Sequence, residues 1–89
     1  MSHKQQNQLL KSILQGPISG NIHWREVESL LHHLGATIEP AHGARMRAVL
    51  NGVEGTLHKP HHGGVCEKHD VRHIREFLEA AGVQVPAQE

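Results

Sequence analysis

Residues 45–58 of this chain read Arg-Met-Arg-Ala-Val-Leu-Asn-Gly-Val-Glu-Gly-Thr-Leu-His, a pattern that predicts a β-hairpin. Asn51-Gly52 lies between two alternating segments, and Asn-Gly in that position is the strongest short-range signal for a two-residue hairpin turn. A two-residue turn fixes the register of the strands, so the pairs can be counted outward from it. The count places Arg45 directly opposite His58.

The two faces of this hairpin differ in chemistry because successive side chains of a strand point to opposite sides. The apolar face is predicted to carry Met46, Ala48, Leu50, Val53 and Leu57. The polar face is predicted to carry Arg45, Arg47, Thr56 and His58. A surface that is both cationic and titratable is suited to handling phosphate groups.

Helices are predicted on both sides of the hairpin, over residues 4–15, 23–34 and about 68–81, because apolar residues recur there every three or four positions. Residues 36–40 predict a further strand. The order is helix, helix, three strands, helix, which indicates an α+β fold. An antiparallel meander with two helices on its apolar face makes a two-layer sandwich.

Three roles are open for the first helix. Its apolar stripe consists of Leu9, Leu10, Ile13 and Leu14. The helix could cover the open face of the sheet, extend the core, or mediate dimerisation if the stripe is exposed. Residues 18–22 are expected to form a connector to the next helix, and residues 59–64 a loop rich in glycine and proline.

Composition indicates one small domain. The chain has 89 residues, 37% of them hydrophobic, and no apolar run approaches the roughly 20 residues needed to span a bilayer, so no membrane association is expected. The single cysteine, Cys66, excludes an intramolecular disulfide, and a cytoplasmic location is expected. Formal net charge is zero with ten neutral histidines, so attraction to nucleic acid must come from local clusters of basic residues.

Several short motifs follow one another along residues 22–83. They are Leu34-Gly35, Gly43, Asn51-Gly52, His58-Lys59-Pro60-His61, and the helical run from Ile74 to Gly82. Their order and spacing resemble those of the HicA family, small RNA-cleaving toxin components of bacteria. The resemblance implies a double-stranded-RNA-binding-domain-like α-β-β-β-α fold over residues 22–83. Residues 1–21 would add an N-terminal helix and connector, and residues 84–89 a tail.

The chain departs from the family at the entry to the hairpin. The family carries Gly-Ser-His or Gly-Thr-His there, and the histidine is its proposed catalytic residue, whereas this chain has Gly43-Ala44-Arg45. The resemblance therefore leaves two readings. One is a HicA-like toxin of a type II toxin–antitoxin system that binds RNA and cleaves mRNA without a metal. The other is a non-catalytic RNA- or protein-binding relative that has lost the histidine base.

The resemblance also implies partners. These are RNA and a cognate HicB-type antitoxin. A homodimer is a separate possibility, which depends on the apolar stripe of the first helix. No cofactor is expected. Contacts to RNA would come from the basic residues of the hairpin and its flanking loops, namely Arg45, Arg47, His42, Lys59 and His58.

Cleavage of RNA by its own 2′-hydroxyl needs a base, an acid and a cation on the phosphate. Histidine suits the first two roles because it exchanges protons near neutral pH. Arginine suits the third, since its planar fork clamps phosphate but does not easily release a proton. His58 is therefore the candidate base, Arg45 the clamp, and His61 an assisting residue.

A metal site is a third hypothesis. His69 and His73 are four residues apart on one helix face, and Cys66, His61 and His62 lie just upstream. Strong zinc signatures contain paired cysteines, which this chain lacks, so no metal site is predicted. Cys66 is expected to be a structural or an exposed thiol and not a nucleophile, and Trp24 is expected to pack in the core.

Overall fold

The computed structural model describes residues 3–60 and 64–85 of the chain. These residues form an α+β fold with three helices and two antiparallel sheets. The helices are α1 (His3–Leu14), α2 (Trp24–His33) and α3 (Lys68–Ala80). Each lies within two residues of its predicted bounds.

The larger sheet is a meander in the order β2-β3-β4. Its strands are β2 (Thr37–Pro40), β3 (Arg45–Leu50) and β4 (Val53–His58). The smaller sheet pairs two short antiparallel strands, β1 (Ile22–His23) and β5 (Val65–Cys66).

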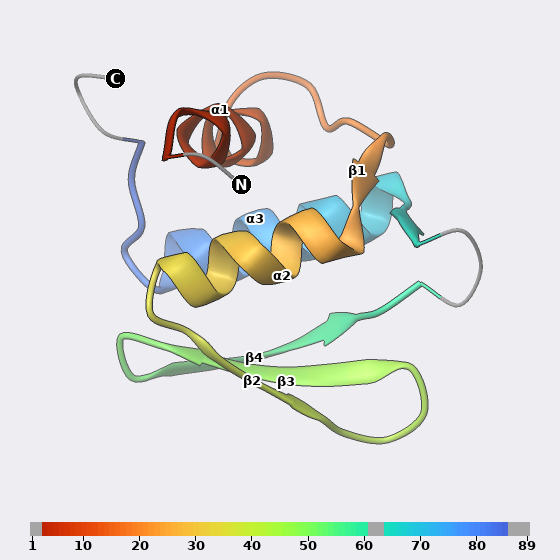
Figure 1. Cartoon of the computed structure of the whole chain (residues 1–89). Helices are drawn as coiled ribbons and strands as arrows, with labels where there is room; N and C mark the ends of the chain where they lie inside the picture. The colour runs from red at the N-terminus through yellow and green to blue at the C-terminus, as the bar shows by residue number, and fades with distance from the viewer. Residues whose placement is uncertain (1–2, 61–63, 86–89) are drawn as a thin grey trace.

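The sequence does not predict the smaller sheet. Residue 22 is expected in a connector, and nothing is expected of residues 65–66, because a two-residue strand has no periodicity to detect. The pairing of Ile22 with Cys66 brings the start of α2 beside the start of α3. Both helices therefore begin at the same end of the molecule (Figure 1).

The hairpin register is confirmed along its whole length. Asn51 and Gly52 have φ values of 52° and 80°, the positive pair that a type I′ turn requires. The ladder then runs outward to the predicted pairing of Arg45 with His58. The apolar face packs into the core, and the polar face is exposed, as the alternation predicts.

The helices form two layers on one side of the sheet. Helices α2 and α3 cover its apolar face, and α1 lies on the far side of them from the sheet (Figure 1). Leu10 and Ile13 of α1 are buried in the common core. The first helix therefore extends the core and does not cover the open sheet face, and its buried stripe gives no support to a homodimer.

Arg75 of α3 holds the end of α1 in place. Its Nε donates to the carbonyl of Ile13 at 2.5 Å, and its Nη2 donates to the carbonyl of Gly16 at 2.9 Å. The last carbonyls of a helix have no partner within the helix, so a guanidinium that binds them stabilises the helix end.

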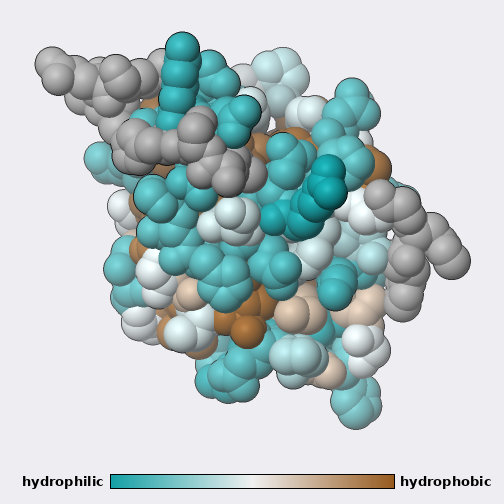
Figure 2. Space-filling model, viewed as in Figure 1, coloured by the Kyte–Doolittle hydropathy of each residue, from teal (hydrophilic) through white to brown (hydrophobic). Residues whose placement is uncertain are grey.

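Most of the viewed surface is hydrophilic, and the apolar side chains lie mainly between the layers (Figure 2). Val65 is the one large hydrophobic residue that is exposed among residues 3–60 and 64–85. Within the same residues, no helix is long and apolar enough to cross a membrane. The fully buried large side chains are Ile13, Val27, Leu30, Leu31, Leu57, Cys66, Val71, Ile74 and Leu78.

Helix α3 approaches β4 so closely that only glycine fits at position 55. A Cβ placed on Gly55 would lie 2.5 Å from Cδ1 and 3.1 Å from Cε1 of Phe77. Phe77 is itself buried in the core, so the ring has little room to move away. The absence of a side chain at Gly55 therefore sets the distance between α3 and the sheet.

Gly55→Ala should destabilise the fold by about 1–3 kcal/mol, because the added methyl overpacks the contact with Phe77. Urea unfolding followed by circular dichroism measures the change. Gly20→Ala is the matched control, because its Cβ would meet only Cγ of Lys68, at an ordinary 3.5 Å. Equal stability of the two variants would show that the close approach does not constrain the fold.

The hairpin turn also binds the end of α3. Nδ2 of Asn51 donates to the carbonyl of Ala81 at 2.9 Å. Asn51 thus has two functions, since it adopts the left-handed conformation of the turn and it satisfies a carbonyl just beyond the helix.

Two substitutions of Asn51 separate these functions. Asn51→Gly keeps the turn and loses the hydrogen bond, which should cost about 1 kcal/mol. Asn51→Ala loses both, and the left-handed alanine should cost about 1–2 kcal/mol more. Thermal or urea unfolding of both variants provides the comparison, and equal losses would contradict the conformational role of Asn51.

Candidate functional site

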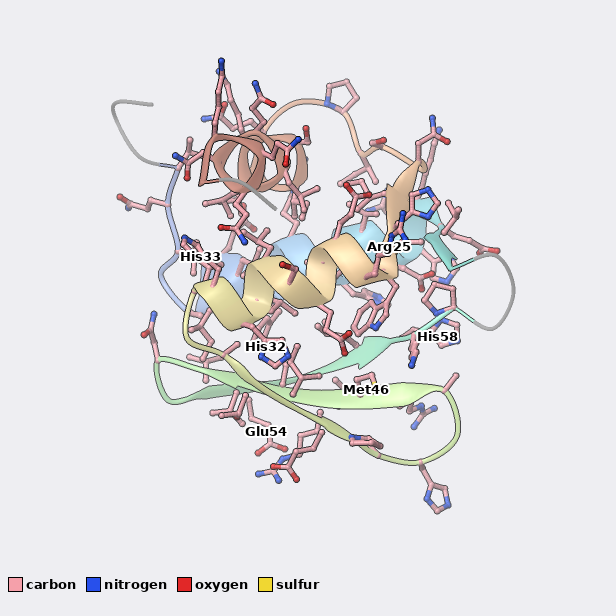
Figure 3. All side chains as sticks on the ribbon, viewed as in Figure 1. Arg25, His32, His33, Met46, Glu54 and His58 are labelled. Atoms are coloured by element: carbon pink, nitrogen blue, oxygen red, sulfur yellow. The ribbon has the colours of Figure 1, made fainter. Side chains whose placement is uncertain are left out.

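The predicted Arg45–His58 pair lies at the open end of the β3–β4 ladder. Arg45 is exposed, and the His58 side chain is 45% exposed. Figure 3 labels His58 at the end of β4, on the side of the molecule where α2 and α3 begin. A hollow of about 280 Å³ lies here between the sheet and α3. It is lined by Arg45, Thr56, Leu57, His58, His69, Asp70 and His73.

Asp70 is the buried charge of this site. Its side chain is only 3% exposed, and its Oδ2 accepts a hydrogen bond from the backbone N–H of Glu67 at 3.1 Å. This reach from the third helical residue back to the N-cap is one half of a capping box. The N-terminus of a helix also favours a negative charge, so the local sequence explains why an aspartate is held here.

The second oxygen of Asp70 faces two histidines. Oδ1 lies 3.4 Å from Nδ1 of His58 and 3.2 Å from Nε2 of His69. Neither contact has the geometry of a hydrogen bond, and Oδ1 is buried without a hydrogen-bond partner among the described residues. A buried carboxylate beside an imidazole nitrogen holds the ring in one orientation.

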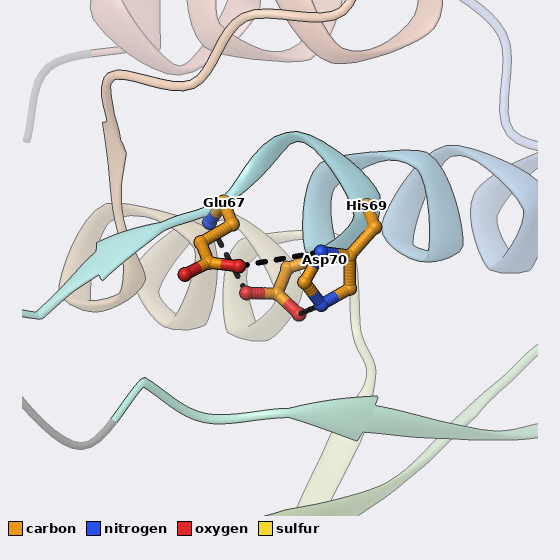
Figure 4. Close-up of side chains that lie close together, drawn as sticks. All are labelled: Glu67, His69 and Asp70. Carbon is orange, nitrogen blue, oxygen red and sulfur yellow. Dashed lines mark hydrogen bonds and ion pairs between the residues drawn. The ribbon is translucent and has the colours of Figure 1, made fainter.

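His69 lies between two carboxylates (Figure 4). Its Nδ1 is 3.4 Å from Oε2 of Glu67, and its Nε2 is 3.2 Å from Oδ1 of Asp70. His73 follows one turn later on the same helix, with its ring edge-on to that of His69 and the centroids 6.3 Å apart. The hollow therefore combines one guanidinium, three imidazoles and one buried carboxylate.

Arg47, a predicted RNA contact, is already paired. Its Nε lies 3.0 Å from Oε2 of Glu54, and its Nη2 donates to Oε1 of Glu54 at 3.2 Å. The hydrogen bond to Glu54, with the charge of that carboxylate, raises the pKa of Arg47 above its ordinary value. Glu54 thus offsets much of the positive charge that Arg47 would bring to the open sheet face.

The other predicted contacts lie around the hollow and do not line it. His42 is exposed in the loop between β2 and β3. Lys59 lines a neighbouring hollow of about 440 Å³ together with His23 and Arg25. His61, the predicted assisting residue, lies outside the described residues.

The sequence did not assign Asp70 to the site, and His69 and His73 were not predicted to join Arg45 and His58. The Glu-x-x-Asp spacing of Glu67 and Asp70 could have indicated a helix start with a capping carboxylate. No local signal shows that this carboxylate meets His58, because that contact depends on how α3 packs against β4.

Cys66 is a buried, structural thiol, which is one of the two alternatives expected from the sequence. It is fully buried beneath the start of α3. Burial, with the nearby charge of Asp70, raises its pKa to about 11. A buried thiol that stays protonated is a poor nucleophile and a poor metal ligand.

No known protein family, curated protein or solved structure gives a significant match to the chain. Function must therefore be inferred from the residues of the site and their geometry.

The Cys66 thiol should react slowly with a disulfide reagent at pH 8 in the folded protein and quickly in urea. Stability should also fall as pH rises from 9.0, the ordinary thiol pKa, toward about 11, because only the unfolded chain ionises its thiol in that range. Urea unfolding across this range measures the loss, and Cys66→Ala should remove the thiol-dependent part. Equal reaction rates in the folded and unfolded chain would contradict the burial.

Proposed function

We propose that this chain is a HicA-like toxin component that binds RNA and cleaves it without a metal. The observation that carries the proposal is the joint placement of Arg45 and His58 in one hollow, with the buried Asp70 carboxylate against the His58 ring. The order α2, three-stranded meander, α3, with the short strand β5 added before α3, also agrees with the α-β-β-β-α fold that the resemblance implies.

The reaction is a transfer within the RNA strand. The ribose O2′ attacks the adjacent phosphorus, the bond from phosphorus to O5′ breaks, and a 2′,3′-cyclic phosphate and a 5′-hydroxyl result. His58 takes the proton from the 2′-hydroxyl. Since its Nδ1 faces Asp70, the proton would be exchanged through Nε2. Arg45 stabilises the negative charge that grows on the phosphate oxygens.

The leaving O5′ needs a proton, and a second histidine of the hollow is placed to donate it. We assign this role to His73, because His69 already has a carboxylate at each ring nitrogen. Asp70 is a positioning residue, because it contacts His58 and the substrate would not touch its buried oxygen. The missing family histidine is replaced here by a base on the opposite strand.

Two further parts of the proposal come from the resemblance. The partner protein would be a HicB-type antitoxin that occupies the Arg45–His58 surface and prevents access of RNA. The site of action would be the cytoplasm, where mRNA is found. The exposed basic groups Arg25 and Lys59 beside the hollow are suited to binding neighbouring phosphates of the strand.

The purified chain should cut a single-stranded RNA and leave 2′,3′-cyclic phosphate ends, while the all-2′-deoxy analogue should stay intact. His58→Ala should slow cleavage by at least about 100-fold, since it removes a proton acceptor. RNA affinity should change little in that variant. His32→Ala, on the exposed last turn of α2, is the matched control and should cleave as the wild type does. Gel analysis of end-labelled RNA provides the rates.

Two outcomes would contradict cleavage by this site. If the wild type binds RNA but does not cut it, and Arg45→His does cut, the chain is the non-catalytic relative. If His58→Ala and His32→Ala cleave equally fast, another group is the base. In either case Arg45→Gln should still weaken RNA binding. It should also reduce the slope of log affinity against log salt concentration by about one, because a phosphate contact is lost.

A further inference from the structure

The start of α3 gathers three metal-binding side chains, and only one of them, Asp70, has a part in the proposed RNA cleavage. Glu67, His69 and Asp70 can each offer one donor atom such that all three atoms lie within 4.8 Å of one another. Figure 4 shows the three side chains converging on one side of the first helical turn. Carboxylate oxygens and imidazole nitrogens are common ligands of Zn²⁺ in proteins.

The distances in the cluster also match the spacing of two ligands on one metal ion. Two ligands on a tetrahedral zinc, each bound at about 2.0–2.1 Å, lie about 3.3 Å apart. Nε2 of His69 is 3.2 Å from Oδ1 of Asp70, and Nδ1 of His58 is 3.4 Å from the same oxygen. That oxygen is buried and has no hydrogen-bond partner among the described residues.

A buried carboxylate oxygen without a hydrogen bond is costly unless a cation satisfies it, and the two imidazoles beside Oδ1 carry a positive charge only when they are protonated. Asp70 cannot turn away, because its other oxygen is held by the backbone N–H of Glu67 at 3.1 Å. Oδ1 is therefore fixed toward His69. A second contact that orients a ligand in this way is typical of metal sites.

We propose that Glu67, His69 and Asp70 form a binding site for one divalent transition-metal ion of the Zn²⁺ class. Asp70 Oδ1 and His69 Nε2 are the fixed pair, and binding replaces their present contact with two bonds to the ion. The Glu67 side chain is 74% exposed and can rotate to supply a third ligand.

Zinc titration of the full chain, prepared without a polyhistidine tag, tests the site by calorimetry and by competition with a chromogenic indicator. The wild type should bind one Zn²⁺ ion in a tight first step, with any further ions binding more weakly. His69→Ala should weaken that step by at least about tenfold, and Glu67→Gln by less, because Asp70 and His69 remain. His32→Ala is the matched control, since it removes an exposed histidine at the far end of α2 and should leave the tight step unchanged.

Asp70→Asn should also abolish the tight step, but it removes a helix-capping charge, so circular dichroism must show that the variant is folded. His69→Ala carries the test if it is not, because the His69 side chain is 61% exposed and its removal leaves the core intact. Titration with Co²⁺ gives a second readout, since its visible absorption reports tetrahedral ligation.

Two results would overturn the proposal. One is the absence of any tight step in the wild type. The other is several weak, equivalent ions whose binding His69→Ala and His32→Ala reduce equally, which is adventitious binding by ten scattered histidines. Neither result depends on RNA cleavage, so the metal site and the proposed function fail or stand separately.

Discussion

The register of the β3–β4 hairpin is the constraint on which the rest of the structure depends. Asn51 and Gly52 fix the turn, and every pair in the ladder follows from it. A slip of one residue would exchange the two faces of the hairpin, exposing the core and burying the charges. The same register places Arg45 beside His58 and Gly55 beneath Phe77. One turn thus controls both the packing of α3 and the composition of the hollow.

Local signals were enough to predict the main elements. The hairpin was predictable because its turn and its alternation are both encoded within residues 45–58, and the helices because their apolar residues recur with helical spacing. The β1–β5 pair was not predictable, because two residues carry no pattern. Arg45 and His58 could be assigned to a common site from sequence, since cross-strand neighbours follow directly from the turn.

The rest of the site depends on tertiary packing. Asp70 reaches His58 because β5 pairs with β1 just before α3 begins, and because Gly55 lets α3 approach β4. Neither condition is visible as a motif. The pairing of Arg47 with Glu54 was also missed, although both residues lie on the polar face that the alternation predicts. Counting the acids of that face together with its bases would have reduced its expected charge.

Asp70 has one role in the fold and another in the proposed site. One of its oxygens closes the N-terminus of α3, and the other faces the imidazoles of His58 and His69. Stability of the helix start and orientation of the site therefore share one side chain. Such sharing explains how a small domain can hold a charged residue in its interior, since the helix N-terminus stabilises the carboxylate in the absence of any ligand.

The Arg45–His58 hollow is the proposed binding site for an RNA phosphate. NMR titration of the ¹⁵N-labelled chain with a short all-2′-deoxy oligonucleotide, which cannot be cleaved, tests it most directly. The largest shifts should fall on Arg45, Thr56, His58 and the first turn of α3, and they should weaken as salt is raised. Shifts confined to α1 or to the far end of α2, or no saturable shifts at all, would contradict it.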